Sequence, residues 1–154
     1  AEAKLAGEEN NEAVAERSLL KAVQVDPGSY RAHAELGRFY IARATIPKPE
    51  LARREAEAAL KIDAGESAAY EILAQVYAHE QHWQELDALL ADAQRNVPDD
   101  AGPFYWAAAA LARDGQNVDR AAKYLHKYLG QEPEGRQPTR AQARQLLAKV
   151  SPNS

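Results

Sequence analysis

The sequence repeats one spacing pattern four times. In each copy a small or apolar residue is followed by apolar residues four and seven positions later and by a turn residue after twelve. The copies are Ala15-Leu19-Ala22-Pro27, Ala52-Ala56-Ala59-Ala64, Leu86-Leu90-Ala93-Pro98 and Ala121-Leu125-Tyr128-Pro133, whose starts lie 37, 34 and 35 residues apart. Self-similarity at this period is typical of arrays of helix pairs. Such arrays present an extended surface, which favours binding over catalysis.

The composition favours an all-α domain. The 154 residues are enough for one domain with a buried core. Hydrophobic residues make up 45% of the chain, but Ala dominates them and aromatic residues account for only 7%. Ala has the highest helix propensity. Long β-branched stretches, which would indicate strands, are absent from the sequence.

The charge pattern excludes several classes of partner. The formal net charge of −4 arises from 19 basic and 23 acidic residues that are mixed along the chain. Nucleic acids and anionic membranes would require a basic stripe, and the sequence has none. No apolar run approaches the length of about 20 residues that spans a bilayer, so membrane insertion is not expected. The chain contains no Cys, which leaves both the cytoplasm and the periplasm open for a soluble protein.

The first residue is Ala1 and the sequence contains no Met. We therefore expect a fragment or a processed chain, with further repeats upstream. The high usage of Ala and Arg is typical of a GC-rich bacterial source.

Apolar periodicity and turn residues predict a series of helical segments. We expect a partial first repeat over residues 1–28, with Ala1 inside a first helix and a second helix from Asn11. Three full repeats follow at 29–65, 66–99 and 100–134, and a capping helix at 138–151. Within these, helices are predicted at 11–25, 30–44, 50–62, 67–80, 83–96, 100–113, 118–129 and from 139 onward. Predicted N-caps are Ser29, Ser67, Asp100 and Thr139, the last with Gln142 in a capping box.

A second pattern lies on the first helix of each pair. His33, Leu36-Gly37 and Tyr40 align with Tyr70, Leu73-Ala74 and Tyr77, and with Phe104, Ala107-Ala108 and Leu111. Together the two patterns resemble the tetratricopeptide repeat (TPR) family. The small residues at 37, 74 and 108 would lie where helices cross. His33 departs from the usual aromatic residue and Ala64 from the usual Pro. The resemblance implies a right-handed solenoid of antiparallel helix pairs with a C-terminal capping helix.

No motif in the sequence indicates catalysis, a metal or another cofactor. His79-Glu80-Gln81-His82 resembles a zinc-hydrolase motif, but its His residues are three apart instead of four and no third ligand is evident. Asp99-Asp100 is best explained as a turn followed by a helix cap. Gly102 and Gly115 are isolated turn residues and do not form a phosphate-binding loop. We therefore expect a protein that is not an enzyme.

The resemblance implies that a protein or peptide partner binds the inner face formed by the first helices. The residues of that face are Arg31, Arg38, Ile41, Glu71, Gln75, His79, Tyr105 and Arg113. The simpler alternative is that these are only solvated polar residues. Tyr105 and Trp106 are about 100° apart on a helix, so one should pack and the other stay partly exposed. Two further functions remain open: a regulatory or targeting module of a longer enzyme, and self-association through an exposed terminal face.

Overall fold

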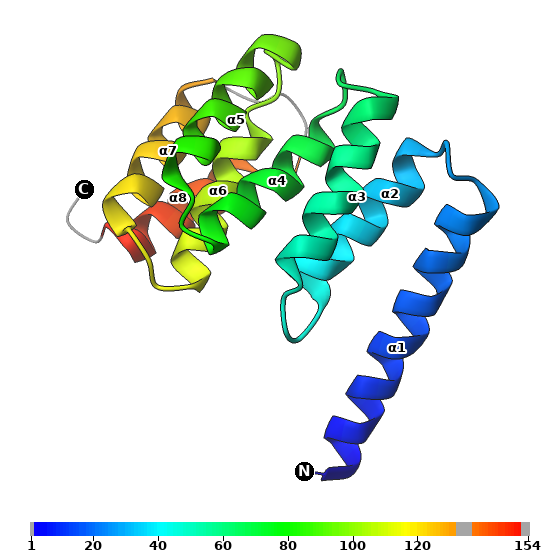
Figure 1. Ribbon diagram of the computed structural model, residues 1–154. Coiled ribbons are helices and arrows are strands. Elements are labelled where there is room, and N and C mark those ends of the chain that lie inside the picture. Colours follow the sequence, from blue (N-terminus) through cyan, green and yellow to red (C-terminus); the bar gives the residue numbers. More distant parts are fainter. Residues whose placement is uncertain (1, 132–136, 152–154) are drawn as a thin grey trace.

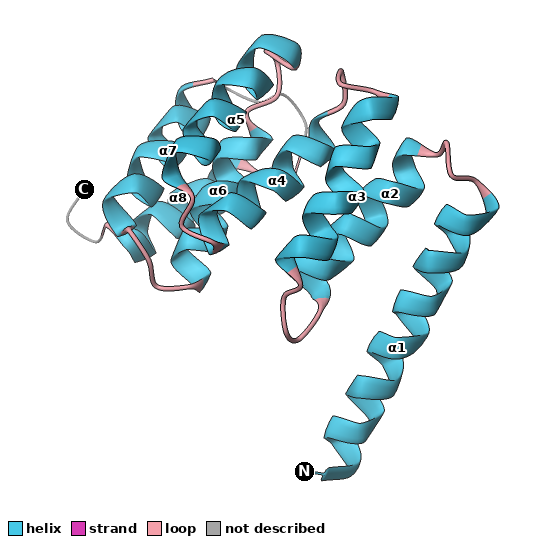
Figure 2. Cartoon of the chain, viewed as in Figure 1, coloured by secondary structure: helices cyan, strands magenta, loops and turns pink. Residues whose placement is uncertain are grey.

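The computed structural model describes residues 2–131 and 137–151. All regular secondary structure within these ranges is helical (Figures 1 and 2). The elements are α1 (Glu2–Val25), α2 (Tyr30–Arg38), the π-helix η1 (Phe39–Arg43), α3 (Pro49–Ile62), α4 (Ser67–His79), α5 (Trp83–Asn96), α6 (Gly102–Arg113), α7 (Val118–Gly130) and α8 (Arg140–Val150). The all-α prediction is confirmed.

Helices α2 to α7 form three antiparallel pairs, which stack side by side as a right-handed solenoid (Figure 1). The first helices, α4 and α6, pack against one another, and each second helix also packs against its own partner. Helix α8 lies against α7 and α6 at the C-terminal end of the stack, as predicted for a capping helix. None of the described helices has the length and apolar content needed to cross a bilayer.

Small residues set the distance between packed helices. Gly37 faces the backbone oxygen of Ala52, and a Cβ at position 37 would lie only 3.3 Å from that oxygen. The equivalent residues Ala74 and Ala108 have no exposed surface. A larger side chain at any of these positions would push two helices apart.

His33 makes the same contact as the Tyr that follows one repeat later. Nε2 of His33 lies 2.8 Å from the carbonyl oxygen of Pro27, and the hydroxyl of Tyr70 donates to the carbonyl oxygen of Ala64 at 2.9 Å. In both cases the acceptor belongs to the turn six residues earlier. Although His33 departs from the aromatic residue of the TPR pattern, it ties α2 to the preceding turn as Tyr70 ties α4.

Helix α1 is longer than predicted. We expected a turn before Asn11, but one continuous helix extends from Glu2 to Val25. Gly7 is the only strong helix breaker in its first half, and a single Gly costs only about 1 kcal/mol in a helix. The structure of Ala1 lies outside the described residues. Helix α1 packs chiefly against α2 and stands at the edge of the stack (Figure 1).

The predicted helix at 30–44 ends in a different geometry. The amide of Ala44 donates to the carbonyl oxygen of Phe39 at 2.9 Å, five residues earlier, so the last turn is a π-helix. The amide of Lys48 then bonds the carbonyl oxygen of Tyr40 at 2.8 Å. The wider turn thus provides hydrogen-bond partners for the backbone groups where η1 leads into the connection to α3.

The caps agree with the predictions only in part. Ser29 and Thr139 cap α2 and α8 through their side chains, and the capping box with Gln142 is confirmed. Ser67 does not cap α4; it is the first helical residue, and Glu66 occupies the cap position. Ala101, not Asp100, is the N-cap of α6, but the Asp100 carboxylate accepts the amide of Gly102 at 2.8 Å. Pro133 and the rest of 132–136 lie outside the described residues.

Candidate functional site

The face formed by α2, α4 and α6 carries a row of charged side chains. Arg38 lies between two carboxylates: its NH1 donates to Oε1 of Glu35 at 3.2 Å, and its NH2 lies 3.9 Å from Oε2 of Glu71. The Arg38 side chain is 38% exposed and that of Glu71 is 15% exposed. The structure therefore brings together two of the predicted residues, Arg38 and Glu71, and adds Glu35, which the sequence prediction missed.

On the same face, Asp114 joins two of the predicted residues. Its Oδ2 lies 2.8 Å from Nδ1 of His79, and its Oδ1 accepts from Nε of Arg113 at 3.3 Å. The Arg113 guanidinium also reaches across α4, where NH1 donates to the carbonyl oxygen of Ile41 at 3.3 Å. Three repeats thus contribute to one cluster, and 40% of the Arg113 side chain stays exposed.

Gly102 makes room for the Glu71 carboxylate at the start of α6. A Cβ at position 102 would collide with Oε1 of Glu71 and would lie 2.8 Å from Oδ1 of Asp100. From the sequence alone, Gly102 is expected to be an isolated turn residue. Its missing side chain instead lets the carboxylate lie against the N-terminal turn of α6, where a negative charge is favourable.

Two of the predicted face residues are buried. Ile41 has no exposed surface, because it lies in the π-helical turn, whose side chains are shifted from the α-helical register on which the prediction was based. Gln75 is 5% exposed, and its Nε2 donates to the Glu71 carbonyl oxygen at 3.3 Å. The side chains of Ile41 and Gln75 therefore lie below the surface that a partner would touch.

Arg31 lies apart from the other predicted residues. It is exposed and lines a groove between α1 and α2, together with Leu19, Ala22 and Val25. The groove has a volume of about 560 Å³.

The two neighbouring aromatic residues of α6 have different surroundings. Tyr105 packs against the core, and its ring centroid is 5.5 Å from that of Tyr128 on α7. Burial raises the pKa of the Tyr105 hydroxyl. Trp106 packs edge-on against Tyr105 at 5.2 Å and is partly exposed. Tyr105 is partly exposed as well, so the predicted contrast between a packed and an exposed ring is not seen in the exposure of the two side chains.

The His79–His82 segment has separate partners for its side chains. His79 bonds Asp114, Glu80 is ion-paired with Arg53 of α3, and the His82 ring lies 6.4 Å from that of Tyr77. Gln81 has a φ of 59°, so the backbone turns sharply between the two His residues. Within residues 2–131 and 137–151 no cluster of three or more His, Asp or Glu side chains is placed to hold a metal ion.

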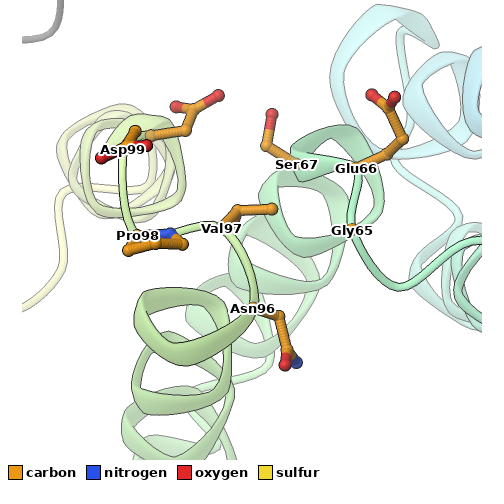
Figure 3. Close-up of a pocket in the computed structure, with 8 residues that line it drawn as sticks. Gly65, Glu66, Ser67, Asn96, Val97, Pro98 and Asp99 are labelled. Atoms are coloured by element: carbon orange, nitrogen blue, oxygen red, sulfur yellow. The ribbon is translucent and has the colours of Figure 1, made fainter.

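A polar pocket lies between the turns that precede α4 and α6 (Figure 3). Its volume is about 300 Å³, and its lining residues are Gly65, Glu66, Ser67, Asn96, Val97, Pro98, Asp99 and Asp100. The carboxylates of Glu66 and Asp99 come from opposite turns. The Asn96 amide is directed away from the opening toward Tyr70, to whose hydroxyl it donates at 2.8 Å.

The fold has solved counterparts, whereas no protein-family model and no curated protein sequence matches this chain. A crystal structure of MamA aligns over 92% of this chain and 88% of its own, with a TM-score of 0.58 and 19% sequence identity. A second MamA crystal structure covers 92% and 82%, with a TM-score of 0.57 and 19% identity. The chain has a fold similar to that of MamA, a TPR-like helical repeat protein. At this identity the likeness concerns the fold alone.

Proposed function

We propose that the chain is a scaffold that binds a protein or peptide segment along the face of α2, α4 and α6 and does not catalyse a reaction. The observation that carries this proposal is the charged row on that face. Arg38 and Arg113 are both partly exposed on it, and each lies beside a carboxylate. The fold supports the proposal, because stacked helix pairs offer an extended surface to a partner.

The chemistry of the row favours a segment that carries both charges. A carboxylate of the partner would compete with Glu35 or Asp114 for the exposed guanidinium groups, which bind carboxylates with two parallel hydrogen bonds. A basic side chain of the partner would lie near Glu71, beside Arg38. Trp106 offers an apolar contact beside Tyr105.

Affinity capture from a lysate tests this assignment. The purified chain is compared with an Arg38→Glu/Arg113→Glu variant and with a control, Arg95→Glu/Arg144→Glu, that has the same charge change at exposed positions on α5 and α8. We expect the wild type and the control to retain the same proteins and the Arg38→Glu/Arg113→Glu variant to lose them. If all three chains recover the same proteins, the assignment of the binding face to α2, α4 and α6 is wrong.

A further inference from the structure

A groove lies between α5 and α7, the second helices of two neighbouring pairs (Figure 1). Over their described lengths these two helices do not pack closely on each other, whereas the first helices α4 and α6 do. The groove has a volume of about 540 Å³. Its α5 wall consists of Asp87, Leu90, Ala91 and Gln94, which recur at helical spacing and so lie along one side of α5. This wall is two turns long, about 10 Å, and therefore suits an elongated segment.

The base of the groove is aromatic. Phe104 of α6 and Tyr124 of α7 both line it, and their rings pack edge-on with centroids 6.0 Å apart. The Tyr124 hydroxyl donates to Oδ1 of Asp87 at 2.9 Å and accepts from NH1 of Arg120 at 2.9 Å. Since these bonds occupy the polar end of Tyr124, a partner meets the ring. Ala91 on the α5 wall is small and partly exposed, which leaves room for an apolar side chain of a partner.

The charges of the groove favour an acidic partner. Among the described residues that line it, Asp87 is the only acid, and NH1 of Arg120 already pairs with Asp87 at 2.8 Å. Lys123 and Lys127 of the α7 wall are exposed, and neither forms an ion pair with a described residue. Two lysine charges thus stay uncompensated in the groove, although the whole chain has a net charge of −4.

We propose that an acidic amphipathic helix of another protein binds the groove between α5 and α7. Lys123 and Lys127 are one helical turn apart, about 6 Å along the axis of α7. Two carboxylates that lie four residues apart on a helix have the same spacing, so a helix that lies along α7 meets both lysines at once. Its apolar side faces Ala91 and the aromatic base, and its carboxylates lie at the edge of the groove, where charges select the partner.

A synthetic helix tests the groove. The probe is a labelled peptide of about 14 residues with Leu at helical spacing and Glu at the other positions. Fluorescence anisotropy measures its Kd for the full chain. We expect binding to the wild type, and binding to Lys123→Glu/Lys127→Glu that is about tenfold weaker or more, because like charges then meet. Lys61→Glu/Lys149→Glu has the same charge change at exposed positions on α3 and α8 and should bind as the wild type does.

The same titration contains two outcomes that would overturn the proposal. One is the absence of binding to the wild type, and the other is equal weakening by the two double variants. A peptide with Lys in place of Glu should not bind, and its binding would contradict the role of the lysines. Circular dichroism checks that each variant keeps the helix content of the wild type.

Ala91→Arg separates insertion into the groove from general attraction of charges. It adds a positive charge but fills the space beside the aromatic base, so we expect the acidic peptide to bind about tenfold more weakly or less. Unchanged or tighter binding would show that the peptide lies only on the charged surface, and would overturn the proposal. Arg38→Glu/Arg113→Glu should bind the probe as Lys61→Glu/Lys149→Glu does, because α2, α4 and α6 carry those arginines. This result is therefore independent of the partner-binding face.

Discussion

Nδ1 of His33 lies 2.7 Å from Oε2 of Glu55, and both side chains are buried. The pair joins α2 to α3, and the other ring nitrogen of His33 contacts the carbonyl oxygen of Pro27. A carbonyl oxygen only accepts, so Nε2 carries a proton and the imidazole is held at both ends. One side chain thereby ties a turn and two helices together.

Removal of the Glu55 carboxylate should destabilise the protein. In Glu55→Ala, His33 keeps its buried position but loses a partner, and we expect the free energy of unfolding to fall by about 3 kcal/mol. Glu57→Ala, on an exposed position of the same helix, should change it by less than about 0.5 kcal/mol. Urea denaturation followed by circular dichroism measures both. A similar small effect in the two variants would show that the buried pair contributes little.

Enlargement of Gly37 should separate two helices. A Leu side chain would extend beyond the Cβ position, which already lies 3.4 Å from Cδ1 of Ile72 and from Cβ of Glu55. Overpacking of this kind costs about 1–3 kcal/mol. Gly7→Leu provides the control, because nothing lies within 4 Å of a Cβ there. Thermal unfolding should show a lower Tm for Gly37→Leu only. An unchanged Tm would mean that the helices move apart without loss of stability.

Three tyrosines should resist ionisation. Burial, the largest cause in each case, raises the pKa of Tyr30, Tyr40 and Tyr124 to about 12. A pKa raised above the unfolded value stabilises the fold fully below about pH 10, and this contribution is lost as the pH rises through about 12. As the pH is raised from about 10 to 12, the phenolate absorbance of the folded protein should therefore increase later than that of free tyrosine. In urea the same titration should return to about pH 10. A native titration complete at pH 10 would contradict the buried environment.

Asp87 should make stability depend on acid pH. Burial alone would raise the pKa of Asp87, but hydrogen bonds from Arg120 and Tyr124 at 2.8 and 2.9 Å outweigh it and lower the pKa. A lowered pKa stabilises the fold above the unfolded value near 4, and the contribution is lost as the pH falls through the folded value. Wild type should therefore be more stable than Asp87→Asn at pH 7, and the difference should vanish in strong acid. If the difference in stability between wild type and Asp87→Asn does not change with pH, it arises from packing and not from the charge of Asp87.

Much of the fold follows from local sequence signals. The start of α3, one residue before the predicted Glu50, the bounds of α5 and the capping box at Thr139 were predictable because proline, apolar spacing and cap residues act over a few positions. The continuity of α1 was not, because the repeat pattern suggested a turn that the residues around Asn11 do not enforce. The π-helix depends on hydrogen bonds with the following connection and has no local signature.

The candidate face was predictable only in outline. Repeat positions identified Arg38, Glu71, His79 and Arg113, which the structure joins in two clusters. Asp114 was missed, because the sequence Asp114-Gly115 is typical of a turn, and only the packing of α4 on α6 brings its carboxylate to His79. Whether a partner uses this face stays a prediction.

The bond from Arg113 to the Ile41 carbonyl has a mechanical consequence. It links the last turn of α6 to η1, which ends the first helix of the first full pair, and so connects the first and the last pair directly. A partner carboxylate that binds the Arg113 guanidinium would replace this hydrogen bond. Partner binding and the curvature of the superhelix would then change together.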